Sequence, residues 1–215
     1  MKSSFIIDNT IKYVQKAFNN AEGGHDWWHT HRVYLNARKI AENESDVDLE
    51  VVLLAALLHD IADSKFHDGN EEIGPETARK FLASEGFDNQ KLEHVVSIIE
   101  NISFKGGNSK RTFNSKELDI VQDADRLDAI GAIGIARVFN YGGFKGNEIY
   151  NPDIKPNLEM TKEEYKKGKQ PSVNHFYEKL LLLRDLMNTN AGRELAQERH
   201  DFMLKYLEQF YREVN

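Results

Sequence analysis

The sequence predicts an all-α fold, a bundle of about eight to nine helices. Apolar residues recur at three- and four-residue intervals along most of the chain, which is the period of an amphipathic helix. Only 4 of the 215 residues are proline, so few helices would be interrupted. The apolar run Val51–Leu58 is too short to cross a bilayer and therefore indicates a helix buried in the core.

Composition excludes several classes of protein. The chain carries 28 Lys and Arg against 35 Asp and Glu, a formal net charge of −7, which argues against a general binder of nucleic acids or anionic membranes. It has no cysteine, which excludes disulfides, thiolate zinc sites and cysteine nucleophiles. The first residues lack the sustained apolar core of a signal peptide, so a cytoplasmic protein is expected.

Three helices are expected in the first part of the chain. Asp26 is the predicted N-cap of the second helix, and Asp46 or Asp48 caps the third. His29 shares the apolar face of the second helix, whereas His31 lies two residues round it. The three helices are predicted at about residues 4–20, 26–43 and 48–63.

Four further helices are expected in the middle of the chain. Pro75 lies in the first turn of one, and Asn114 with Glu117 forms the pattern of a capping box. Asp125 then falls on the inward face of its helix, and Gly142–Gly143 ends the helix that follows. The four helices are predicted at about residues 74–86, 90–103, 114–128 and 129–141.

The last third begins with a long polar segment, 144–170, that has no clear period. Loops of this length are usually functional lids or mobile segments. Two helices, at about 171–187 and 191–212, then supply packing surfaces. No internal repeat or convincing boundary divides the chain. We therefore expect one domain over 1–215, with a core at about 20–143 and C-terminal packing helices at 171–213.

The apolar run ends abruptly in His59 and Asp60. A buried helix that delivers an imidazole and a carboxylate into the interior must pair them, because an unpaired buried charge is costly. Together with His29 and Asp125, they give two imidazoles and two carboxylates at inward positions of different helices. This donor set suits Mn²⁺, Fe²⁺, Co²⁺, Ni²⁺ or Zn²⁺ better than Mg²⁺ or Ca²⁺, which prefer oxygen ligands alone.

The order of these residues resembles the HD-domain metal-dependent phosphohydrolases, whose pattern is His…His-Asp…Asp on a helical core. The matching residues are His29, the pair His59-Asp60, and Asp125 in the stretch Asp-Ala-Asp-Arg-Leu-Asp. The resemblance covers most of the chain and extends to one bacterial subgroup, which includes hydrolases that cleave nucleoside triphosphates and release pyrophosphate. It implies one divalent transition metal, preferably Mn²⁺, held by these four residues.

Histidines elsewhere in the chain leave alternatives open. His31 competes with His29, but the family's first histidine precedes an Arg-Val pair by three residues, as His29 does. Two-metal members of the superfamily need additional histidines, and His67 and His94 do not supply a convincing set, so one metal is expected. For His94, substrate contact and a core hydrogen bond are equally good interpretations. No direction is assigned to His25.

Several other residues are candidates for the chemistry. Lys65 lies one turn after the His-Asp pair, where its ammonium could bind a phosphate, although a solvated loop lysine fits the sequence equally well. Asp63 could orient a catalytic water or accept its proton, or could simply end the helix. Asn174 and His175 start a helix after the long loop and are candidates for substrate binding.

The predicted function is metal-assisted hydrolysis of a nucleotide phosphoanhydride, from nucleoside triphosphate to monophosphate and pyrophosphate. The nucleotide rests on the resemblance alone. Two alternatives remain: a nucleoside monophosphate phosphatase or cyclic nucleotide phosphodiesterase, and a sensor that binds nucleotide and metal without turnover. The partner is a small phosphate compound, with no nucleic acid or membrane, and the chain is expected to be a monomer or homodimer.

Overall fold

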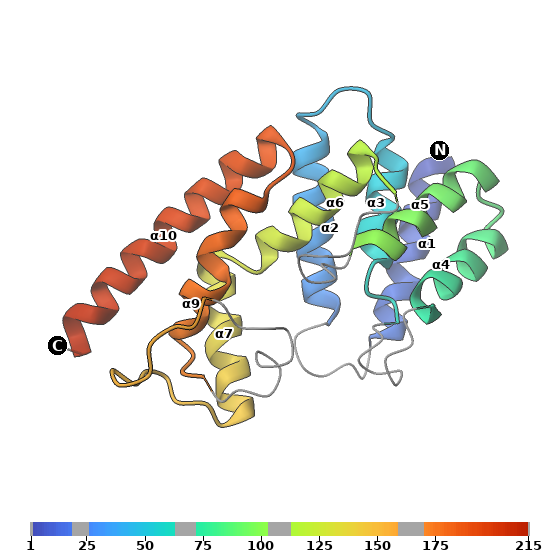
Figure 1. The fold of residues 1–215 in the computed structure, drawn as a ribbon. Coiled ribbons are helices and arrows are strands. Elements are labelled where there is room, and N and C mark those ends of the chain that lie inside the picture. Colours follow the sequence, from blue (N-terminus) through green and yellow to red (C-terminus); the bar gives the residue numbers. More distant parts are fainter. Residues whose placement is uncertain (1, 19–25, 63–71, 103–112, 159–169, 215) are drawn as a thin grey trace. The chain divides into compact units, whose positions relative to one another are not determined.

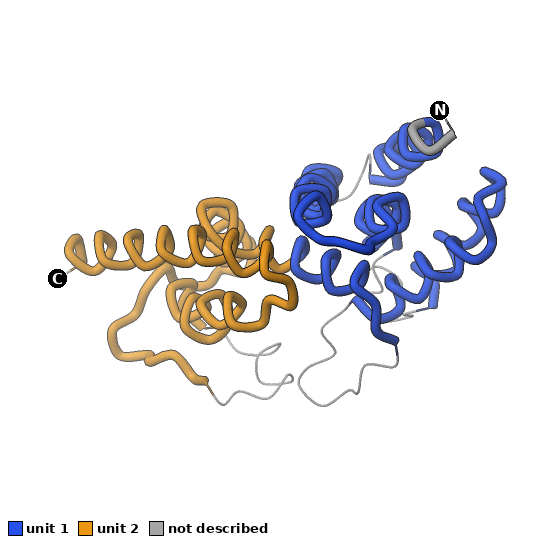
Figure 2. The backbone as a smooth tube through the Cα atoms, turned by 90° about the horizontal axis from the view of Figure 1, so that it is seen from above, with its two compact units in different colours: residues 1–125 blue, residues 126–215 orange. Residues whose placement is uncertain are grey.

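The computed structural model describes residues 2–18, 26–62, 72–102, 113–158 and 170–214. Within these ranges it contains nine α-helices, one 3-10 helix and no strand, which confirms the predicted all-α fold (Figure 1). The chain divides into two compact units, residues 1–125 (unit 1) and 126–215 (unit 2) (Figure 2). That the whole chain forms a single domain stays a prediction.

Unit 1 is organised around α3, the apolar run that precedes the His-Asp pair. Every side chain from Val51 to Leu58 is buried, and α3 contacts α1, α2 and α5. Burial of each large aliphatic side chain contributes about 2 kcal/mol to folding. The helices of this unit are α1 (Lys2–Ala17), α2 (Trp27–Ala41), α3 (Leu49–Leu58), α4 (Ile73–Ser84), α5 (Asn89–Ile102) and α6 (Lys116–Asp128), whose last residues belong to unit 2.

Side-chain caps determine where three of these helices begin. The carboxylates of Asp26 and Asp48 accept backbone N–H groups in the first turns of α2 and α3, which confirms Asp26 and, of the two alternatives for α3, selects Asp48 over Asp46. The prediction of Asn114 as the cap of α6 is wrong, because the Ser115 hydroxyl accepts the first-turn N–H instead. The Glu117 carboxylate does not reach back along its own helix but accepts the backbone N–H of Asp48 at 2.9 Å.

Unit 2 consists of the end of α6 and the elements that follow it. Gly142–Gly143 does not end α7: Gly142 is buried against Ser172, and the helix ends at Gly146, whose φ of +66° is left-handed. The predicted helix 171–187 is a short α-helix followed by a 3-10 helix, and α10 contacts both α7 and that 3-10 helix. The elements are α7 (Gly131–Lys145), α9 (Asn174–Glu178), η2 (Leu180–Leu186) and α10 (Asn190–Val214).

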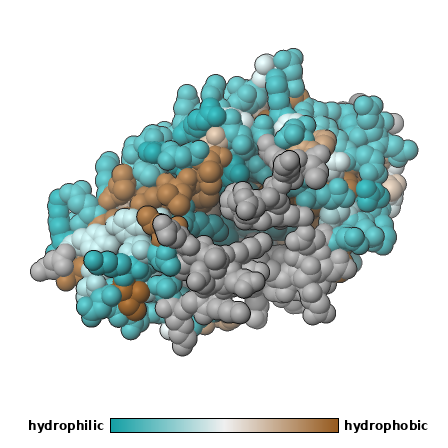
Figure 3. Space-filling view, viewed as in Figure 1, coloured by the Kyte–Doolittle hydropathy of each residue, from teal (hydrophilic) through white to brown (hydrophobic). Residues whose placement is uncertain are grey.

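The surface drawn in Figure 3 is mostly polar, with apolar residues gathered in a few patches. Exposed apolar side chains of unit 2 include Leu182 and Leu186 on η2 and Phe202 on α10. No helix in the described part of the chain combines the length and apolarity needed to span a membrane.

Candidate metal centre

Three segments of unit 1 bring four side chains to one place. His29 lies in the first turn of α2, where the Asp26 carboxylate accepts its backbone N–H at 2.8 Å. His59 directly follows the last residue of α3, and Asp60 comes next. Asp125 lies in the last turn of α6. Each of these side chains therefore lies at or near a helix end. The third helix is predicted to end near Asp63, but α3 ends at Leu58.

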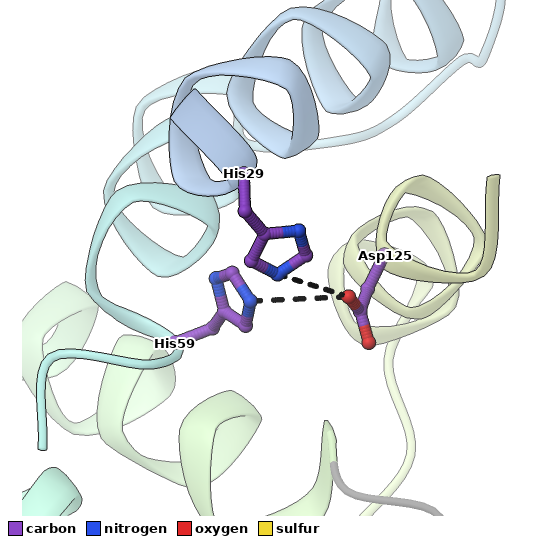
Figure 4. A group of neighbouring side chains, drawn as sticks. All are labelled: His29, His59 and Asp125. Carbon is purple, nitrogen blue, oxygen red and sulfur yellow. Dashed lines mark ion pairs between the residues drawn. The ribbon is translucent and has the colours of Figure 1, made fainter. Parts of the chain in front are cut away.

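The donor atoms of these side chains converge. Nε2 of His29 lies 3.5 Å from Oδ2 of Asp60 and 3.5 Å from Oδ1 of Asp125. Nε2 of His59 lies 3.4 Å from the same Asp60 oxygen and 4.0 Å from the same Asp125 oxygen. Figure 4 shows both imidazole rings directed toward the carboxylate of Asp125, with ring centroids 5.4 Å apart. The structure thus brings together His29, His59 and Asp125 as a possible metal-binding group, and Asp60 lies within ion-pair distance of both histidines.

A backbone hydrogen bond orients the imidazole of His59. Its Nδ1 lies 2.9 Å from the carbonyl oxygen of Ala56, and because a carbonyl only accepts, Nδ1 must donate. In the neutral ring, Nε2 then carries the lone pair that faces the carboxylates. This atom is buried and makes no hydrogen bond within the described residues. Nε2 of His59 is therefore oriented to bind either a proton or a metal cation.

The electrostatics of the cluster favour positive charge. Burial by itself would lower the pKa of His59, but the carboxylates of Asp60 and Asp125, helped by the Ala56 carbonyl, raise that pKa to about 9. The two histidine side chains are only 2% exposed, whereas those of Asp60 and Asp125 are 19% and 43% exposed. Among the described residues of this cluster, the two carboxylates are therefore more exposed to solvent than the two imidazoles.

The donor set fits a divalent transition metal. Ligands about 2.1 Å from a shared ion lie about 3.0–3.5 Å apart at octahedral to tetrahedral angles. The histidine-to-carboxylate separations in the structure are 3.4–4.0 Å, within or slightly above this range. Two imidazole nitrogens with two carboxylate oxygens suit Mn²⁺, Fe²⁺, Co²⁺, Ni²⁺ or Zn²⁺. If all four residues bound one six-coordinate ion, positions would remain for water or substrate, as a catalytic site requires.

Two other histidines of unit 1 lie in different surroundings. His31 stands among aromatic rings, with centroids 5.3 Å from Trp27 and 6.3 Å from Tyr34, and is not part of the group around His29. Nε2 of His94 is 3.0 Å from the hydroxyl oxygen of Ser115 at the start of α6. This contact agrees with the hydrogen-bonding interpretation of His94, and a substrate contact stays a prediction.

The remaining candidates lie outside the described residues or in unit 2. Asp63 and Lys65 lie outside the described residues. Asn174 is buried in unit 2, where its amide nitrogen donates to the carbonyl of Ile154 at 3.0 Å. His175 also belongs to unit 2, and burial, with a smaller contribution from the Lys179 ammonium, lowers its pKa to about 4. Substrate binding by Asn174 and His175 stays a prediction.

One part of the site carries no signal in the sequence. The carbonyl that orients His59 comes from Ala56, and every residue has such a group, so only the end of α3 decides which one is used. The sequence likewise assigns no role to Asn36 or Gln122, two amide side chains on the helices that carry His29 and Asp125. Their hydrogen bonds become visible only in the folded chain.

Comparison with known proteins identifies close relatives. The family model described as HD domain matches residues 27–130. The Bacillus subtilis protein YpgQ is 38% identical over 203 residues, which cover 94% of this chain and 90% of YpgQ. A crystal structure of an HD-superfamily hydrolase from Bacillus thuringiensis is 40% identical, covers 99% of this chain and 98% of its own, and superposes with a TM-score of 0.79.

A second structure bears on ligands. The crystal structure of Bacillus subtilis YpgQ in complex with ADP is 37% identical to this chain and superposes with a TM-score of 0.79. The match covers 99% of this chain and 97% of that one. The similarity therefore includes both units and is not confined to the four-residue cluster.

Proposed function

The chain belongs to the HD-domain superfamily of metal-dependent phosphohydrolases, and we propose that it hydrolyses a nucleotide phosphoanhydride, converting a nucleoside triphosphate and water to the monophosphate and pyrophosphate. The observation that carries the proposal is the convergence of His29, His59, Asp60 and Asp125. Their donor atoms come from three separate segments and lie 3.4–4.0 Å apart in the pairs that join a histidine to a carboxylate.

The four residues would hold one divalent ion, with Mn²⁺ as the preferred metal. When bound, such an ion supplies Lewis-acid chemistry, since it lowers the pKa of water and polarises a phosphoryl oxygen. The protein itself contributes the orientation of the ligands. The Ala56 carbonyl keeps the lone pair of His59 Nε2 directed at the cluster, and the Asp26 cap holds the helix turn that carries His29.

Support for a nucleotide substrate comes from the ligand of a related protein and from the side chains proposed to contact a phosphate. The relative YpgQ has been crystallised with ADP, a nucleoside diphosphate. In this chain Lys65 would offset negative charge on a phosphate, and Asp63 would orient the attacking water or accept its proton. His94, Asn174 and His175 are further proposed contacts to the substrate. A cytoplasmic location and a monomeric or homodimeric state belong to the same proposal.

The test is turnover with a defined panel of nucleotides. Purified protein is stripped of metal, reloaded with Mn²⁺, Fe²⁺, Co²⁺, Ni²⁺ or Zn²⁺, and assayed separately for pyrophosphate and orthophosphate. We expect pyrophosphate from nucleoside triphosphates, and none from the Asp125→Asn variant. Orthophosphate from monophosphates, or opening of a cyclic ester, would instead identify the phosphatase or phosphodiesterase alternative. Nucleotide binding without turnover under any metal would identify the sensor.

A further inference from the structure

Asp125 is the least enclosed member of the metal centre. Its side chain is 43% exposed, whereas the side chains of His29 and His59 are only 2% exposed. Close packing therefore holds the histidines, but little packing holds the carboxylate. The position of Asp125 therefore depends on the translation of α6 along its axis and on the rotation of α6 about that axis. Side chains that fix α6 within unit 1 would also fix the carboxylate.

Gln122 ties α6 to the end of α5. It lies on α6 one turn before Asp125 and is buried. Its Nε2 donates to the carbonyl oxygens of Asn101 and Ile102, at 3.1 and 3.3 Å. These are the last two residues of α5, and the last carbonyls of a helix accept no backbone N–H from within the helix. A two-carbonyl clamp of this kind resists both sliding and rotation of α6.

Asn36 ties α6 to the helix that carries His29. It lies two turns after His29 on the same face of α2, by the three-and-four spacing. Its Nδ2 donates to the carbonyl oxygen of Ala124 at 3.4 Å. Ala124 directly precedes Asp125, so this bond joins the backbone next to one ligand to the helix of another. It links the segments that carry His29 and Asp125.

We infer that Gln122 and Asn36 are positioning residues, which hold the Asp125 carboxylate where it can bind the same cation as His29 and His59. The inference rests on the proposed function, because it assumes a cation at the centre. Neither amide is a ligand, and each acts through the placement of α6. Loss of either bond would leave the two histidines in place and let the carboxylate drift.

The first variant is Gln122→Met, which keeps the side-chain length and removes the donors. We expect the affinity for Mn²⁺, measured by calorimetric titration of metal-free protein, to fall by about tenfold, the lower end of the cost of losing a residue that supports a metal ligand. At saturating Mn²⁺, the turnover of the variant should return close to that of the wild-type protein. The matched control is Arg79→Met, which removes the 2.8 Å ion pair to Glu93 between α4 and α5 without touching α6.

The second variant is Asn36→Ala, which is decisive if Gln122→Met fails to fold as judged by circular dichroism. Its expected effect on Mn²⁺ affinity has the same direction. Its control is Asn43→Ala, because the amide of Asn43 donates to the carbonyl of Lys39 at 2.9 Å and makes this contact close to its own helix end. The control should bind Mn²⁺ as wild type does.

A double-mutant cycle separates positioning from general damage. In the Asp125→Asn background, Gln122→Met should cause a much smaller further loss of Mn²⁺ affinity, because its effect passes through the residue already changed. An equal loss in both backgrounds would overturn the inference, as would wild-type affinity in both single variants. Failure of the wild-type protein to bind Mn²⁺ would instead refute the metal centre and with it the proposed function.

Discussion

Removal of the His59 imidazole provides the most direct test of the metal centre. In the wild-type protein, Mn²⁺ at 100 times its Kd should stabilise the folded state by about 2.7 kcal/mol, because the ion binds the folded chain and not the unfolded one. For a chain of this length, about 2–4 °C of Tm accompanies each kcal/mol, so the expected rise in Tm is about 5–10 °C. His59→Ala removes a nitrogen that lies 3.4 Å from the Asp60 carboxylate and should abolish the rise.

The assay is thermal unfolding by circular dichroism, with and without Mn²⁺, after removal of bound metal. The rise in Tm is compared rather than Tm itself, because the loss of a buried imidazole also lowers the stability of the metal-free protein. His31→Ala is the control, since His31 stands among Trp27 and Tyr34 and should keep the full rise. A full rise in the His59→Ala protein, or its loss in the control, would refute the assignment of ligands.

Three further predictions concern stability. Leu54→Ala, at a fully buried position of α3, should cost about 2–5 kcal/mol in urea unfolding, whereas the exposed Leu35→Ala should cost far less. The pKa of His175 is lowered to about 4, so as the pH falls below about 6.5 this histidine binds a proton in the unfolded chain before it does so in the folded one. The free energy of unfolding should therefore drop by up to about 3 kcal/mol between pH 6.5 and 4. His175→Gln should remove that part of the acid sensitivity. Gly131→Ala should destabilise, because its φ is +75° and an added Cβ would lie 3.0 Å from a side chain, whereas Gly143→Ala, in open space within α7, should stabilise by up to about 1 kcal/mol in the same unfolding assay.

Much of the local structure follows from neighbours in the chain. The buried run Val51–Leu58 predicted the central helix, and Asp26 and Asp48 predicted helix starts that the structure confirms. Helical period and side-chain caps depend on residues only a few positions apart, so a sequence records them directly. Local patterns misled where two polar residues competed or a close contact intervened. Ser115 rather than Asn114 caps α6, and Gly142 packs against Ser172 inside a helix that continues.

The sequence alone determined that the chain is helical, that an imidazole and a carboxylate follow its most apolar helix, and which family's order of ligands it carries. Only the tertiary structure decided that Nε2 of His29 and Oδ1 of Asp125 lie 3.5 Å apart, although 96 positions separate them in the chain. It also placed His29 rather than His31 beside His59 and Asp125, in agreement with the choice made from the sequence. These outcomes depend on how distant helices pack, and packing adds up many contacts that no local pattern contains.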